Sequence, residues 1–172
     1  MIFMAPLREA VRNASWFAAL GEPLTDGDVA DAKAYSGSEH IGCVASWPEA
    51  EAFLKSPTVS LDWWDREEAL RKELLAKAER QYPERALWTS LTELTTEAGA
   101  LVHGKAATAA ARAGNAQAAS IHVAAGAAAQ AVYQLAVARI AGSESSPFES
   151  KFRLFAAGRW PLGMVGSKLI LF

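Results

Sequence analysis

The residues best suited to chemistry in this sequence are six polar side chains in and beside a region that is otherwise mostly alanine. They are Glu93, Glu97, His103, His122, Gln130 and Gln134. The two glutamates are four residues apart, as are the two glutamines, so each pair lies on one face of a helix. If the chain reverses direction at Gly114, the two histidines face one another across two helices. The same register brings each glutamate close to one of the glutamines.

This arrangement has two interpretations. One is a polar pocket between two long helices, in which a glutamate with a raised pKa serves ligand binding or catalysis. The other is a polar seam, in which contacts between carboxylates and amides fix the register of closely packed helices. We favour the seam, because buried polar residues in coiled coils commonly have this role.

No set of residues is spaced for a metal ion. A di-iron bundle needs Glu-x-x-His pairs, but Ala100 and Ala119 stand three positions before the two histidines. His40 and Cys43 supply only two ligands, and a zinc site needs at least three. The acidic run that begins at Asp26 lacks the closing glutamate of a calcium loop. The sequence therefore predicts no metal, no cofactor and no catalytic residue.

A second candidate is the run Arg159-Trp160-Pro161-Leu162-Gly163, which is the least generic stretch of the chain. The Trp-Pro pair favours an extended turn, so the run can serve as a bridge between the last helix and the tail. An arginine beside a tryptophan is also a common anchor of protein interfaces. Both interpretations stay open for Arg159 and Trp160.

The elements that hold these residues are expected to be helices. Start and stop signals predict helices over residues 6–21, 47–55, 60–82, 83–113, 117–141 and 147–158, with a shorter one after Thr25. Half of the residues from 106 to 141 are alanine, which lets two helix axes approach closely. We therefore predict a mainly all-α fold, a multi-helix bundle around a long alanine-rich antiparallel hairpin. Its turn is placed at Ala113-Gly114-Asn115, and Gly104 is a candidate kink.

The tail breaks the helical pattern. Short apolar runs over residues 162–165 and 168–172 flank Gly166-Ser167, a turn signal for a two-residue hairpin. We expect a small C-terminal β-hairpin that covers a helix face, because two strands alone are barely stable. In this arrangement Phe172 is buried although it is terminal.

Length and composition favour one globular domain over residues 1–172. The formal net charge is −2 and no basic stripe occurs, which argues against a nucleic-acid partner. The single cysteine suits a reducing cytoplasm, and the first seven residues do not resemble a secretory signal. No charged residue lies between Arg112 and Arg139, but this stretch is mostly alanine with several polar side chains. We expect it to be a buried helix and not a membrane span.

The stretch Gly-Asn-Ala-Gln-Ala-Ala-Ser-Ile-His-Val at residues 114–123, continuing through alanine-rich turns to Tyr133, resembles small all-helical bacterial immunity-protein-like families. The resemblance covers a minor part of the chain and assigns no site residues. It implies a protein that binds and neutralises a partner toxin and has no catalytic residues of its own.

These observations together predict a cytoplasmic, non-enzymatic helical protein that acts by binding a protein partner or a second copy of itself. The alternative is a small-molecule-binding protein, or an unrecognised enzyme, with a polar pocket between the two long helices. The two hypotheses differ in whether the glutamates and histidines converge on a cavity or on a packed seam.

Overall fold

The computed structural model describes residues 4–114 and 117–172, and its fold is mainly α-helical with a small β element, as predicted. The elements in these residues, in chain order, are α1 (Ala5–Asn13), α2 (Asp26–Ser36), β1 (His40–Cys43), α3 (Trp47–Leu54), α4 (Leu61–Gln81), α5 (Glu84–Arg112), α6 (Ala118–Ile140), α7 (Pro147–Ala156), β2 (Pro161–Val165) and β3 (Lys168–Leu171).

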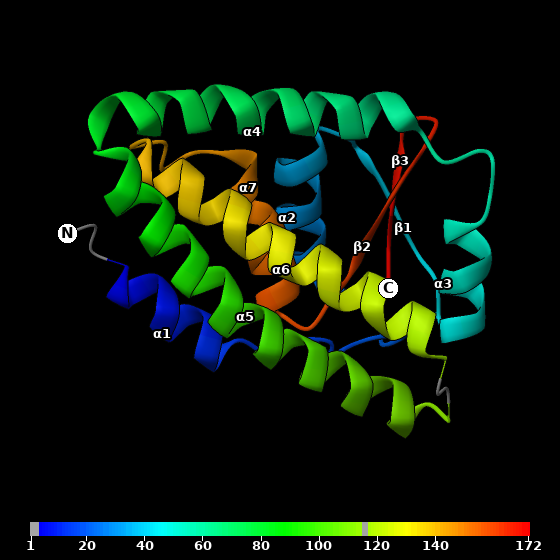
Figure 1. Ribbon diagram of the computed structural model, residues 1–172. Coiled ribbons are helices and arrows are strands. Elements are labelled where there is room, and N and C mark those ends of the chain that lie inside the picture. Colours follow the sequence, from blue (N-terminus) through cyan, green and yellow to red (C-terminus); the bar gives the residue numbers. More distant parts are fainter. Residues whose placement is uncertain (1–3, 115–116) are drawn as a thin grey trace.

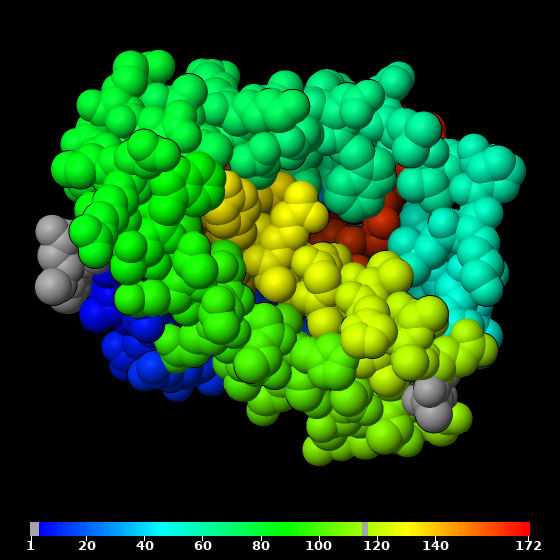
Figure 2. All heavy atoms as spheres, viewed as in Figure 1, coloured from blue at the N-terminus to red at the C-terminus, as the bar shows by residue number. Residues whose placement is uncertain are grey.

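The long helices α5 and α6 run side by side through the molecule (Figure 1). Helix α1 packs along α5, α4 crosses at the top of the view, and α7 packs against both α6 and α2. The strands and α3 lie together at the opposite end from α1. Figure 2 shows α6 recessed between α4 and α5 on this face. A continuous apolar core joins residues from α1 to the C-terminal residue.

The antiparallel hairpin of α5 and α6 is confirmed, and toward the turn the buried residues of both helices are mostly small. These are Ala98, Val102, Ala106 and Ala110 of α5 and Ala124, Ala128 and Ala131 of α6. Helix α5 continues through Gly104 without a break. Gly114 follows with a φ of +73°, the left-handed conformation typical of a helix C-terminus. Asn115, which we predicted to complete the turn, lies outside the described residues.

Two of the predicted helix starts have the expected side-chain caps. The hydroxyl of Thr25 accepts from the Asp28 N–H at 3.1 Å, and the Asp28 carboxylate accepts from the Thr25 N–H at 2.9 Å. The hydroxyl of Ser46 accepts from the Glu49 N–H at 3.4 Å. The Glu49 carboxylate accepts from the N–H of Ala45, one residue before the cap, at 3.0 Å.

Helix α1 is shorter than the predicted range of residues 6–21, and it ends at Asn13. The chain that follows turns toward the C-terminal end of α7, where the Ser15 N–H donates to the Ala156 carbonyl at 2.9 Å. This contact with a distant part of the chain replaces the hydrogen bonds of a continuing helix. The apolar spacing along residues 6–21 does not indicate that this segment contacts α7.

The C-terminal hairpin is confirmed, but it belongs to a three-stranded sheet with the order β1-β3-β2. Strand β3 is antiparallel to β2 and parallel to β1, with His40 opposite Lys168. Strand β1 was not among the predicted elements, because it is short and contains Gly42, and its partner is at the far end of the chain. Phe172 is 3% exposed and exchanges backbone hydrogen bonds of 2.6 and 2.8 Å with Trp160. The predicted burial of the tail is therefore confirmed.

Among the described residues, α6 is the one helix that is long and apolar enough to cross a membrane. Within its most apolar 18-residue window, 56% of the residues are buried inside the fold. Core helices of soluble proteins share this length and composition, so the expected absence of a membrane span stays a prediction.

Candidate functional site

The two histidines of the hairpin meet as predicted. The ring centroids of His103 on α5 and His122 on α6 are 5.0 Å apart, and both residues are exposed. In the part of the chain that the structure describes, no group of three or more potential ligands could hold a metal ion. The pair is thus a surface contact between the two long helices.

The glutamates have different partners from those predicted. Arg8 of α1 donates to the carboxylates of Glu93 and Glu97, at 3.0 and 2.9 Å, and Arg12 donates to Glu97 at 2.7 Å. The hydrogen bond from Arg12 and its charge lower the pKa of Glu97. The predicted seam between glutamates and glutamines is therefore wrong, because this face of α5 is turned toward α1 and not toward α6.

Gln134 is fully buried, but its partners belong to α4 and α7 and not to α5. Its amide nitrogen donates to Glu67 of α4 at 2.8 Å, and its amide oxygen accepts from Lys151 of α7 at 2.9 Å. Lys151 also donates to Glu67 at 2.7 Å, and the Tyr35 hydroxyl donates to the same carboxylate at 2.5 Å. Gln130, one turn away, is exposed. The four buried residues form a polar cluster that ties α2, α4, α6 and α7 together.

Burial shifts the pKa values of two residues in this polar cluster. Desolvation lowers the pKa of Lys151, and the opposing attraction of Glu67 limits this effect. Desolvation also raises the pKa of Tyr35 well above its ordinary value, and the negative charge of Glu67 adds to the rise. Among the described residues, every buried side-chain nitrogen and oxygen has a hydrogen-bond partner. A polar cluster in which every buried atom has a partner stabilises and specifies a fold.

Arg159 and Trp160 are both 2% exposed, which excludes the exposed interface anchor that we considered for them. The Arg159 guanidinium lies 2.9 Å from the Asp28 carboxylate in a buried ion pair. It also donates to the backbone carbonyls of Ala19, Glu22 and Pro23, at 2.5, 2.7 and 2.7 Å. Of the two roles left open, the structure supports the internal one, since Arg159 holds the segment between α1 and α2 in place.

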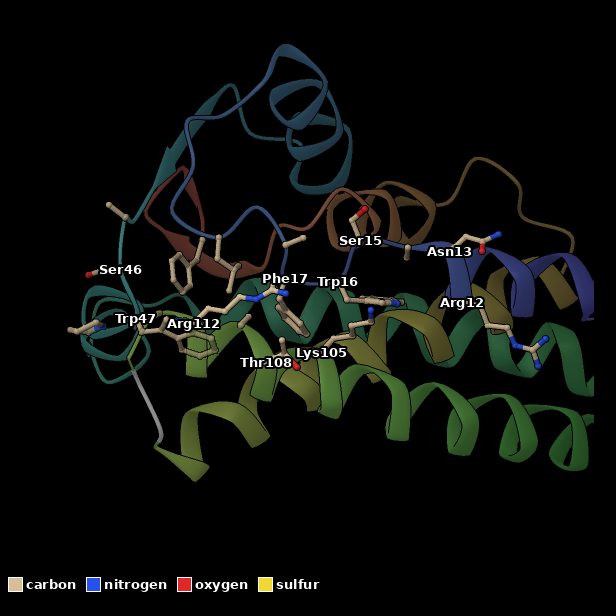
Figure 3. Close-up of a pocket in the computed structure, with 18 residues that line it drawn as sticks. Arg12, Asn13, Ser15, Trp16, Phe17, Ser46, Trp47, Lys105, Thr108 and Arg112 are labelled. Carbon is tan, nitrogen blue, oxygen red and sulfur yellow. The ribbon is translucent and has the colours of Figure 1, made fainter.

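This segment forms one wall of a pocket of about 710 Å³ (Figure 3). The opposite wall is the C-terminal half of α5, which contributes Lys105, Thr108 and Arg112. These residues are three and four positions apart and therefore lie on one helix face. The start of α3 closes the pocket at the end where Ser46 lies.

The floor of the pocket is aromatic and closely packed. Its rings belong to Trp16, Phe17, Trp47 and Phe172, each 2–3% exposed. Phe17 has a φ of +59°, a left-handed conformation that costs a non-glycine residue about 1–3 kcal/mol. The Arg159 contacts and the packing of Phe17 against Phe155 and Trp160 keep the backbone in this conformation. The floor is thus pre-formed, whereas Lys105, Thr108 and Arg112 of the α5 wall are exposed.

The charge of the pocket is positive. Arg12, Lys105 and Arg112 line it, and no aspartate or glutamate side chain does. Arg12 is paired with Glu97, at 2.5 Å. Neither Lys105 nor Arg112 has an ion pair with any residue that the structure describes. Figure 3 shows both side chains extending from α5 toward the segment that carries Trp16 and Phe17.

The sequence contained only part of this site. The spacing of Lys105, Thr108 and Arg112 is visible in the chain, and a charged helix face of this kind is usually a solvated surface. What turns it into a pocket wall is the segment after α1, whose path depends on α7 and Arg159. These α5 residues were not predicted as a site, because no residue near them in the sequence indicates that another segment of the chain lies opposite them.

Comparisons of the chain with protein families, with curated proteins and with solved structures find no match. The resemblance of residues 114–133 to immunity-protein-like families stays a prediction.

Proposed function

We propose that this protein is a binding protein for a small organic anion, which it holds in the pocket between α1, α3 and α5. The observation that supports the proposal is the charge of the lining: Lys105 and Arg112 have no ion pair among the described residues, and no acidic side chain lines the pocket. Two cations near one concave surface attract an anion and hold it by charge-assisted hydrogen bonds.

The size and rigidity of the pocket support the same proposal. Small-molecule sites commonly have volumes of about 300–1,000 Å³ and are largely pre-formed. The pocket has about 710 Å³, and its floor is fixed by Arg159 and by packed aromatic rings. A pre-formed floor lowers the entropic cost of binding, because few groups are ordered when the ligand enters.

Small-molecule binding is the second of the two functions that the sequence left open, but the proposed pocket lies at a different place in the fold from the one expected. The polar residues first expected to line a pocket between α5 and α6 do not converge: the two glutamates bond to α1, Gln134 belongs to the buried cluster around Lys151, and the remaining three, His103, His122 and Gln130, are exposed. The hypothesis of a protein partner, toxin neutralisation included, stays a prediction, as does the cytoplasmic location. The two residues considered as an anchor for a protein partner, Arg159 and Trp160, are buried.

The test is a binding assay with a panel of small carboxylates, sulfates and phosphates, followed by thermal shift and calorimetry. A double variant, Lys105→Gln with Arg112→Gln, removes both unpaired charges and should abolish anion binding. A matched control, Lys77→Gln with Arg85→Gln, removes the same charge at two exposed positions outside the pocket. Exposed substitutions of this kind usually change stability by about 0.5 kcal/mol or less, so both variants should fold.

Binding that survives in the pocket variant, or that falls equally in the control, would show that anions bind elsewhere or only through the net charge. Absence of binding by every member of the panel would contradict the proposal as well. Affinity should also fall as salt is added, because the exposed charges of the pocket are screened.

A further inference from the structure

The two unpaired cations of the pocket are placed to converge on one compact group. Lys105 and Arg112 are seven residues apart, which corresponds to about 10.5 Å along the helix axis. Thr108 lies between them on the same face, and Figure 3 shows its short side chain between the two long ones. A group above Thr108 is therefore about one helical turn from the base of each cation, within the reach of both side chains.

The hydrogen-bonding chemistry of this wall suits a group that only accepts hydrogen bonds. Lysine and arginine side chains are donors without an acceptor. The Thr108 hydroxyl donates its hydrogen to the Gly104 carbonyl at 2.9 Å, so it offers no donor to a ligand, and Lys105 and Arg112 supply the donors of this wall. A phosphoryl group carries a charge of about −1.5 to −2 at neutral pH and has three acceptor oxygens. It matches two unpaired cations in both charge and hydrogen bonding, with arginine as the bidentate partner.

The remainder of the pocket favours a polar body on the ligand. The aromatic floor is 2–3% exposed, so little ring surface is available for stacking. Asn13 and Ser15 also border the pocket and are exposed, and Figure 3 shows their side chains on the side of the segment away from α5, so the body of the ligand lies in a solvated space. The volume of about 710 Å³ exceeds what a single phosphoryl group fills, which leaves space for an organic part of several polar groups.

We propose that the ligand is a phosphate monoester of a small polyhydroxylated molecule, with its phosphoryl group held between Lys105 and Arg112 above Thr108. This inference rests on the proposed function and makes it specific. The aromatic bases of nucleotides are a poorer match, because the rings of the floor are sealed.

The test compares ligands of the same shape and different charge by calorimetry. The probes are a hexose phosphate, the matching hexose sulfate, the sugar carboxylate glucuronate, and inorganic phosphate. The sulfate and the carboxylate each have one negative charge, whereas the phosphate approaches two. We expect the hexose phosphate to bind about tenfold to a hundredfold more tightly than the sulfate, which is the range for one charge-assisted hydrogen bond.

The pH dependence supplies a second readout. No histidine, cysteine, aspartate or glutamate side chain lines the pocket, so the titrating group between pH 5.5 and 7.5 is the phosphate itself. With a second pKa of about 6, its dianion population and hence its affinity should fall about fourfold from pH 7.5 to pH 5.5. The affinity of the hexose sulfate should stay constant over this range.

Variants locate the group within the pocket. Lys105→Gln and Arg112→Gln should each weaken binding of the hexose phosphate about tenfold to a hundredfold. Arg112→Lys keeps the charge but lacks the planar guanidinium group, so its affinity should lie between that of Arg112→Gln and that of the parent protein. The control with Lys77→Gln and Arg85→Gln should bind as the parent protein does.

Each other outcome contradicts a specific part of the reasoning. If glucuronate or the hexose sulfate binds as tightly as the phosphate, the phosphoryl assignment is wrong, although an organic anion still occupies the pocket. If inorganic phosphate binds as tightly as the hexose phosphate, the polyhydroxylated body is wrong. If none of the probes binds and the wider panel of anions also fails, the proposed function falls with the inference.

Discussion

The ion pair inside the polar cluster gives the sharpest prediction for stability. The side chains of Lys151 and Glu67 are 4% and 6% exposed, so solvent does little to screen them. Lys151→Met keeps most of the side-chain volume but leaves the carboxylate with only the Tyr35 hydroxyl and the Gln134 amide. Removing one partner of a buried pair typically costs about 3–5 kcal/mol, because a charge is left without compensation.

Protonation sets an upper limit on this cost. A buried carboxylate that has lost its cation can take up a proton, which for an ordinary glutamate (pKa about 4.3) costs about 3.7 kcal/mol at pH 7 and about 1 kcal/mol at pH 5. The folded variant then binds a proton that the unfolded chain releases, so its stability falls as the pH rises. We therefore expect Lys151→Met to lose about 3–4 kcal/mol at pH 7 and about 1–2 kcal/mol at pH 5.

Thermal and urea unfolding at the two pH values measure this difference. For a chain of this size, the loss at pH 7 corresponds to a fall in Tm of about 6–16 °C. Arg139→Met is the control, since it breaks a pair with Glu149 that is partly exposed (36% and 23%) and should cost about 1 kcal/mol or less. An equal loss at pH 5 and pH 7 would show that packing, not charge, is responsible. An unchanged Tm at pH 7 would refute the buried pair.

Two further substitutions and one deletion test other parts of the fold. Arg159→Met strands the Asp28 carboxylate and should cost about 3–5 kcal/mol in urea unfolding, whereas full rescue by Arg159→Lys would contradict the role of the guanidinium fork. Deletion of residues 169–172 removes most of the central strand β3 and should give insoluble or molten protein, so a stable truncated monomer in size exclusion would contradict the sheet. Ala128→Leu should cost about 1–3 kcal/mol by overpacking the hairpin, while Val123→Leu, at a 50% exposed position of the same helix, should leave the Tm unchanged.

Local signals in the sequence were sufficient for most helices. Proline at the start of a helix, the caps at Thr25 and Ser46, and apolar residues three or four apart depend on neighbours close in the chain. The alanine content of residues 106–141 also indicated the close hairpin, since two small faces can approach each other with few specific contacts. The facing of His103 and His122 followed from the position of the turn alone.

Local signals in the sequence did not predict how each helix is rotated about its own axis. The position of the turn predicts that Glu97 lies near Gln130. The Glu97 carboxylate instead bonds to Arg8 and Arg12, because α1 packs on that face of α5. Gln134 is turned toward Glu67 of α4, which is far away in the sequence. A spacing of four residues shows that two side chains share a face but does not show which helix covers it.

The pocket is the part that only the tertiary structure decided. The chain alone determined that Lys105, Thr108 and Arg112 lie on one face of a long helix. The end of α1 at Asn13 and the left-handed conformation of Phe17 depend on contacts with α7 and on the buried Arg159, more than a hundred residues later in the chain. Local propensity cannot encode contacts at that separation, because the free energy that stabilises them comes from packing and hydrogen bonds formed only when the whole chain has folded.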